Sequence, residues 1–223
     1  MPVLDRDKYA IALHTSTPQL GIAVNNYAGD SRCQIWDLGR GLASQLHKYL
    51  AEILQPQSWQ DIAFVAVAKG PGGFTGTRVG VVTARTIAQQ LDIPLFGISN
   101  LAAIAIQSAT QDKLVAVQMD ARRGQLFVGI YRVGDRGLEA TLSDTLMTES
   151  EWQKTLSNLH QPYQLLNAED NLAASVTDVL DIAYVQWQQG IQPDWSAIVP
   201  YYGQHPVTSW ELASSWQSWV KNN

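Results

Sequence analysis

The residues of this chain that could carry chemistry are concentrated in a glycine-rich turn at positions 70–76. Its glycines free the backbone from the usual limits on φ, so the chain can turn tightly and approach another surface closely; they are Gly70, Gly72, Gly73 and Gly76. Such a turn before a helix can hold a phosphate on backbone N–H groups, or it can be a docking surface defined by its shape. As a phosphate loop it is unconvincing, because Lys69 precedes the glycines and no Gly-Lys-Ser/Thr follows them.

Arg78 follows this turn, at the start of a predicted helix over residues 77–91. Thr75 or Thr77 is a suitable N-cap for that helix. The helix dipole disfavours a cation in the first turn, so Arg78 requires a compensating anion. We expect a carboxylate of this chain first, then one from a partner subunit, and a phosphate last.

Metal and acid–base patterns are weak in this sequence. His47, His160 and His205 are far apart, and none belongs to an H-x-x-x-H or H-E-x-x-H motif. The segment 120–124, Asp-Ala-Arg-Arg-Gly, is expected to pair its own charges. The alternative is that Arg122 and Arg123 face tRNA or a partner.

The elements around the turn follow a recognisable order. Hydrophobic patterning predicts three strands, then helix, strand, helix, strand and helix, over residues 9–13, 20–24, 33–38, 42–54, 62–68, 77–91, 95–98 and 99–109. This β-β-β-α-β-α-β-α order is that of the ribonuclease-H-like unit of actin, hexokinase and Hsp70-type ATPases.

The second half of the chain is predicted to be a reduced copy of the first unit, with two strands, a helix, a strand and a helix over residues 114–119, 125–133, 149–159, 163–166 and 172–180. The fold class is therefore α/β, of the actin-like ATPase (ASKHA) superfold with a smaller second lobe. We assign residues 1–109 to the first lobe and 110–207 to the second, with a terminal helix over 208–223.

A stripe of small residues runs along the helix predicted after the turn. Gly80, Ala84 and Ala88 are four residues apart, which places them on one face and permits close approach of another helix or a sheet. That neighbour is either this domain's own sheet or a partner, in which case Val79, Val82 and Thr86 serve the core. The helix 42–54 has a similar apolar stripe that includes Leu46 and Leu50.

Composition excludes several classes of protein. The chain has 223 residues, a net charge of −5 and no dense Lys/Arg cluster, which argues against direct nucleic-acid binding. Cys33 is the single cysteine, so no intrachain disulfide forms. The longest apolar run is residues 62–68, too short for a membrane span. We expect a soluble, cytoplasmic protein.

Four blocks of the sequence resemble the bacterial TsaB (YeaZ) family. They are residues 11–24, 38–54, 70–99 and 119–131, and the third is highly specific because its glycines, Thr-Gly-x-Arg and Ile-Pro coincide. Beyond Tyr131 the likeness is slight, with only the segment 198–202 similar to the family's Pro-x-Tyr element.

The resemblance implies a non-catalytic subunit without a cofactor. Proteins of this family bind TsaD and, with TsaE, support transfer of threonylcarbamoyl to the adenosine beside the anticodon of tRNAs that read A-starting codons. Two helices of their first domain contact TsaD. This favours the partner role for Gly80, Ala84, Ala88, Leu46 and Leu50. Whether the isolated chain forms a homodimer stays open.

One departure from the family bears on catalysis. His14 stands in His-Thr-Ser-Thr, where family members commonly have Asp and where nucleotide-binding members of the superfold place a metal–phosphate complex. A neutral imidazole does not supply the hard anionic oxygen that Mg²⁺ prefers. The simpler interpretation is a histidine hydrogen-bonded at a strand end. The second domain also lacks an adjacent glycine pair for adenine. The alternative functions, a free-standing small-molecule kinase or ATPase and a metallopeptidase, are therefore less favoured.

Overall fold

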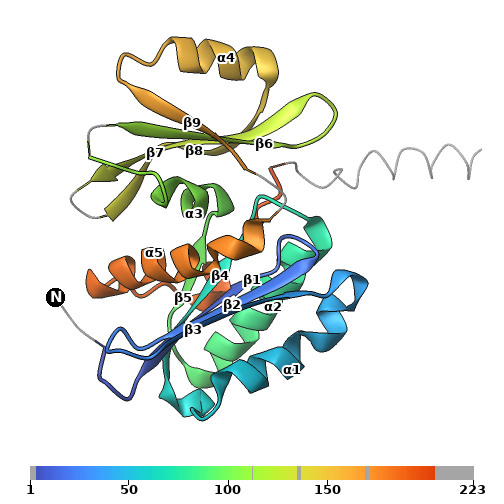
Figure 1. Cartoon of the computed structure of the whole chain (residues 1–223), viewed down its shortest axis with the longest axis vertical. Helices are drawn as coiled ribbons and strands as arrows, with labels where there is room; N and C mark the ends of the chain where they lie inside the picture. Colours follow the sequence, from blue (N-terminus) through green and yellow to red (C-terminus); the bar gives the residue numbers. More distant parts are fainter. Residues whose placement is uncertain (1–3, 112, 135–136, 169–170, 204–223) are drawn as a thin grey trace, which may run out of the picture.

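The computed structural model describes residues 4–111, 113–134, 137–168 and 171–203. The terminal helix expected over 208–223 and His205 lie outside these residues. Two β-sheets are stacked with helices between and outside them (Figure 1). Among the described residues, no helix is long and apolar enough to cross a membrane.

The first sheet has the strand order β3-β2-β1-β4-β5. Strand β1 pairs antiparallel with β2 and parallel with β4. The strands are β1 (Tyr9–His14), β2 (Gln19–Asn25), β3 (Ser31–Asp37), β4 (Ile62–Ala68) and β5 (Leu95–Ile98). The helices α1 (Leu42–Leu54), α2 (Phe74–Leu91) and α3 (Asn100–Ile106) complete this half. The predicted β-β-β-α-β-α-β-α order is confirmed.

The side chains of β1 alternate between two apolar cores. Ile11 and Leu13 pack in the core beneath α1 and α2, whereas Ala10 and Ala12 pack on the opposite face against α5 (Val176–Gln188). The short alanine side chains let α5 lie close to the sheet. In Figure 1, α3 and α5 lie between the two sheets, α1 and α2 outside the first, and α4 outside the second.

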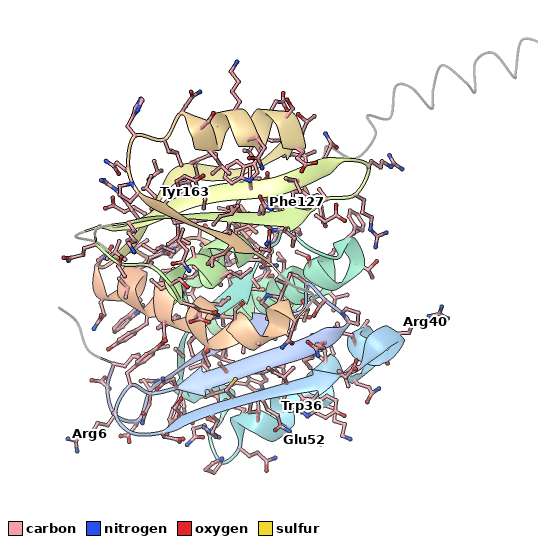
Figure 2. All side chains as sticks on the ribbon, turned by 45° about the horizontal axis from the view of Figure 1, so that its top comes forward. Arg6, Trp36, Arg40, Glu52, Phe127 and Tyr163 are labelled. Atoms are coloured by element: carbon pink, nitrogen blue, oxygen red, sulfur yellow. The ribbon has the colours of Figure 1, made fainter. Side chains whose placement is uncertain are left out.

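The second sheet repeats the first in reduced form. Its order is β8-β7-β6-β9, with β6 antiparallel to β7 and parallel to β9. The elements are β6 (Leu114–Asp120), β7 (Gln125–Gly134), β8 (Gly137–Thr148), α4 (Glu149–Ser157) and β9 (Tyr163–Asn167). The equivalent of β5 is missing from the described sheet. Figure 2 shows Phe127 of β7 and Tyr163 of β9 in this lobe.

The expected lobe boundaries need a correction. The second sheet begins with β6 at Leu114, but α5 packs on the first sheet through Val176, Val179 and Leu180. Ile198 also packs against the core of the first lobe. The chain therefore returns to the first lobe after β9, and residues 110–207 are not one separate unit.

The stripe of small residues on α2, which the sequence predicted to contact a partner, is buried inside the chain. Gly80, Ala84 and Ala88 are buried, and the two alanines belong to the core between α1, α2 and the first sheet. Leu46 and Leu50 of α1 are buried in the same core. The physical reason is that small residues bring α2 close to this domain's own strands, which was the alternative interpretation.

The solvent-exposed face of α2, opposite the buried small residues, carries two apolar side chains. Phe74 is 54% exposed and Val82 is 53% exposed, although Val82 was assigned to the core. Thr86 is also exposed, and Val79 is half-buried against the core. These positions are spaced so that Phe74, Val82 and Thr86 share one side of the helix.

We predict that Ala84→Arg prevents stable folding of the isolated chain. The substitution puts an unpaired guanidinium into a core position with 0% exposure, which costs about 3–5 kcal/mol. Thermal unfolding followed by circular dichroism measures the effect, and the control Val82→Arg should melt like the wild type. A normal melting curve for Ala84→Arg would show that this helix face is not packed as described.

Candidate site at the carboxyl end of the first sheet

The glycine-rich turn packs directly on the loop that follows β1. The Gly73 N–H donates to the Ser16 carbonyl oxygen over 2.7 Å. The Thr77 hydroxyl lies 3.1 Å from Ser16 Oγ, to which it donates, and the Thr15 hydroxyl donates to the Gly76 carbonyl over 2.8 Å. The turn and the β1–β2 loop therefore form one hydrogen-bonded unit.

Close approach, not backbone strain, explains three glycines of this region. A Cβ at Gly72 would lie 2.6 Å from Ser16 Cβ, and one at Gly76 would lie 2.0 Å from the Thr15 carbonyl oxygen. A Cβ at Gly80 would lie 2.1 Å from Thr15 Oγ1. No side chain fits in these spaces.

Only one glycine of the turn adopts a left-handed conformation. Gly70 has a φ of +105°, and a Cβ there would also lie 2.4 Å from the Tyr201 carbonyl oxygen. Gly73 has a φ of −60°, and Gly72 is not among the described residues with positive φ. The turn therefore uses the conformational freedom of glycine at Gly70 and not at Gly72 or Gly73.

This packing leaves no phosphate cradle on the glycine faces. The spaces beside Gly72, Gly76 and Gly80 are filled by Thr15 and Ser16, and the Gly73 amide is already donated within the chain. A phosphate loop needs such amides free and facing the ligand. The turn fixes the position of α2 relative to β1.

Arg78 does not have the internal partner that we expected. It is exposed, and no hydrogen bond or ion pair joins it to another described residue. Helix α2 starts at Phe74 with Gly73 as N-cap, so neither Thr75 nor Thr77 caps it. Arg78 therefore lies beyond the first turn, where the helix dipole disfavours a cation less.

His14, at the end of β1, is a buried neutral imidazole. Its side chain is fully buried, and neither Nδ1 nor Nε2 has a hydrogen-bond partner among the described residues. The interpretation of His14 as a hydrogen-bonded strand-end residue is therefore wrong. Burial lowers its pKa from the usual 6.5 to about 3 because the charged form cannot be solvated. The position offers neither a negative charge nor a hard oxygen ligand.

The other candidate groups do not assemble into a reactive cluster. Within the described ranges, no three His, Cys, Asp or Glu side chains are placed to hold a metal ion. The Asp120 carboxylate accepts the Arg122 backbone N–H over 2.7 Å, and no ion pair joins it to Arg122 or Arg123. The expected pairing of charges in this segment is therefore wrong.

The strand orders of the two sheets and the helix placement define a two-lobed α/β protein of the ribonuclease-H-like, actin-like ATPase superfold. The family model of TsaD, tRNA N6-adenosine threonylcarbamoyltransferase, matches residues 39–198. The chain belongs to this family and, within it, to the TsaB (YeaZ) group.

Individual relatives support this placement. The chain is 36% identical over 122 residues to the tRNA threonylcarbamoyladenosine biosynthesis protein TsaB of Bacillus subtilis, covering 54% of this chain and 53% of that protein. It is 30% identical over 138 residues to Escherichia coli TsaB, covering 55% and 59%. The matched part thus spans little more than half the length of these relatives.

A solved structure shares the fold over a longer range. YeaZ from Pseudomonas aeruginosa superposes with a TM-score of 0.69 at 19% identity, covering 87% of this chain and 99% of that one. The coverage of 87% of this chain means that the likeness in fold extends into the second lobe.

We predict that Gly76→Ala destabilises the chain by about 1–3 kcal/mol, because the new Cβ collides with the Thr15 carbonyl oxygen 2.0 Å away. The neighbouring Thr75→Ala is a matched control, since Thr75 is exposed and its loss should change stability by less than about 0.5 kcal/mol. Urea unfolding compares the two variants. Equal stability of both would disprove the close packing of turn and loop.

His14 should make the stability of the fold depend on pH. Its pKa is lower in the folded than in the unfolded chain, so between about pH 6.5 and pH 3 the unfolded chain binds more protons. The contribution of His14 to the unfolding free energy is therefore fully present above the unfolded pKa of about 6.5. Below that pH it falls by about 1.4 kcal/mol per pH unit.

The measurement compares the wild type with His14→Leu, which keeps an apolar side chain at this position and cannot titrate. Between about pH 7.5 and pH 4.5, the wild type should lose about 2.7 kcal/mol more of its unfolding free energy than the variant does. Parallel pH profiles of the two proteins would show that His14 is solvated or hydrogen-bonded in the folded state.

Proposed function

We propose that this chain acts as TsaB in tRNA threonylcarbamoyladenosine biosynthesis, as a non-catalytic subunit that binds TsaD and, through that complex, works with TsaE. The observation that carries the proposal is that this member of the family has closed the positions where the superfold usually binds phosphate and metal. The turn is packed on Thr15 and Ser16, and the end of β1 holds the buried His14.

Phosphoryl transfer or hydrolysis of a nucleotide needs charge stabilisation that this site does not offer. Mg²⁺ prefers carboxylate and other hard oxygen ligands, whereas His14 presents only a neutral imidazole in an apolar setting. The metal-ligand clusters of a metallopeptidase are likewise missing from the described residues. A scaffold subunit needs only the folded surface that binds its partner, and it needs no reactive centre.

The proposed TsaD-binding surface is the outward side of α2, which replaces the buried stripe predicted from the sequence. Phe74 and Val82 are each more than half exposed, and Arg78 lies between them. The Phe74 ring packs against Tyr202 with centroids 4.4 Å apart, which orients it at the edge of this surface. Two exposed apolar side chains on one rigid helix are suited to the core of an interface.

Arg78 supplies the polar contact of this surface. Because its guanidinium has no ion pair within the described chain, a carboxylate of TsaD can bind it without breaking an existing interaction. The neighbouring helix α1 presents a polar outer side, with Gln45, Lys48 and Glu52 exposed, that forms the rim. With a net charge of −5, the chain is expected to reach tRNA through its partners and not by itself.

We predict that Val82→Arg abolishes the complex with TsaD of the same organism while the isolated chain stays folded. A cation stranded in a desolvated contact costs about 2–5 kcal/mol, enough to lose a moderate complex. Leu165→Arg is the control, because Leu165 is exposed to 39% on β9 in the second lobe. Size-exclusion co-elution with TsaD and thermal melting are measured for both.

The two variants separate the possible placements of the interface. Loss of binding in Val82→Arg with normal binding in Leu165→Arg supports the α2 surface. Binding by Val82→Arg and loss in Leu165→Arg would move the interface to the second lobe. Failure of the wild-type chain to co-elute with TsaD would contradict the proposed function itself.

A further inference from the structure

A cavity of about 350 Å³ lies between the two lobes, apart from the glycine turn's packed face and from the outward side of α2. Its lining comes from Lys69 just after β4, from β5, β7 and β8, from the start of α3, from the second half of α5, and from Tyr201. This volume is at the lower end of the range of small-molecule sites, about 300–1,000 Å³.

Several polar groups of the lining are connected to one another. The Tyr131 hydroxyl donates a hydrogen bond to Asp144 Oδ1 and lies 3.3 Å from Ser99 Oγ. The Tyr201 hydroxyl donates to the Asp144 carbonyl oxygen over 2.9 Å, and the Tyr201 N–H donates to the Lys69 carbonyl oxygen over 2.7 Å. These bonds hold the side chains of Asp144 and Tyr131 in place and tie both lobes to the segment that contains Tyr201.

The strap formed by residues 198–202 gains further contacts on both sides. The Tyr201 ring meets Phe127 edge-on at a centroid distance of 6.5 Å, and Figure 2 shows Phe127 in the second lobe. On the first lobe, a Cβ at Gly97 would lie 2.8 Å from Ile198 Cγ2 and 3.2 Å from Lys69 Cδ. The glycine therefore leaves room for the Lys69 side chain along β5.

Two opposite charges line this cavity without neutralising each other directly. Burial raises the pKa of the Asp144 carboxyl, and the Ser99 and Tyr131 hydroxyls and the Lys69 ammonium oppose that rise. Lys69 and Asp144 form no ion pair with each other among the described residues, so the attraction between them acts over a longer distance. A ligand that carries one positive and one negative group can pair with both the Asp144 carboxylate and the Lys69 ammonium.

The rest of the lining is mostly apolar or small. It includes Gly97, Ile98, Ala102, Leu138, Ala140 and Ile182. A nucleoside triphosphate does not suit this environment, because its several negative charges would lie beside Asp144, and Lys69 is the single cation among the described residues of the lining. A small molecule with an ammonium, a carboxylate and a short apolar part fits the charges and the volume.

We propose that this interlobe cavity binds a free amino acid, with its carboxylate on Lys69, its ammonium on Asp144 and its side chain against the apolar wall. A lone amine or a lone carboxylic acid leaves one charged group of the cavity unpaired, which gives selectivity for the zwitterion. The proposal concerns the chain alone and does not depend on TsaD.

The test uses the full chain without partners. Each of the twenty standard amino acids is screened singly at millimolar concentration by thermal shift, and hits are titrated by calorimetry. We expect at least one hit, and we expect the amine and the carboxylic acid that correspond to its two halves to bind at least about tenfold more weakly, since each loses a charge-assisted contact.

Lys69→Gln should weaken binding of that amino acid by about tenfold or more, because the carboxylate loses its cation while the backbone bond from Tyr201 remains. Lys48→Gln, on the exposed side of α1, is the matched control and should bind like the wild type. The absence of any hit, equal binding of the amine half, or unchanged binding by a folded Lys69→Gln would each overturn the proposal.

Discussion

The close contact between the glycine-rich turn and the loop after β1 is the constraint on which the rest of the first lobe depends. Gly72, Gly76 and Gly80 lie so near Thr15 and Ser16 that no side chain fits between them. This contact sets α2 against the first sheet, which buries its small residues and turns Phe74 and Val82 outward. One packing requirement thus closes the position where a phosphate could bind and creates the apolar surface proposed to bind TsaD.

The burial of His14 also fits a site in which the metal and phosphate positions are closed. A carboxylate at the end of β1 is useful when a metal and phosphates are present, and costly when the position is dry and unpartnered. The imidazole is buried, neutral and without hydrogen bonds in the described structure. Two other polar groups, Lys69 just after β4 and Asp144 of β8, line the cavity where the two lobes meet.

Sequence patterns predicted the elements whose signal is local. The apolar spacing in residues 42–54 and the apolar run before the turn predicted α1 and β4 with the ends that the structure has. Strand β8 was not predicted, although Leu138, Ala140 and Leu142 alternate with polar residues as in a half-buried strand. It is ordered by pairing with β7. The return of α5 to the first sheet was also missed, because an apolar helix stripe does not specify which sheet will cover it.

The same limit explains the error on α2, because small residues at a spacing of four indicate a close neighbour without saying whether it is the chain's own strand. Calorimetric titration of the isolated chain with ATP and Mg²⁺ tests most directly whether the nucleotide position of this fold is closed. We expect binding no tighter than about 1 mM, equivalent to about −4 kcal/mol. A dissociation constant of about 1 μM would show that the nucleotide position is open and would favour a free-standing kinase or ATPase of the same superfold.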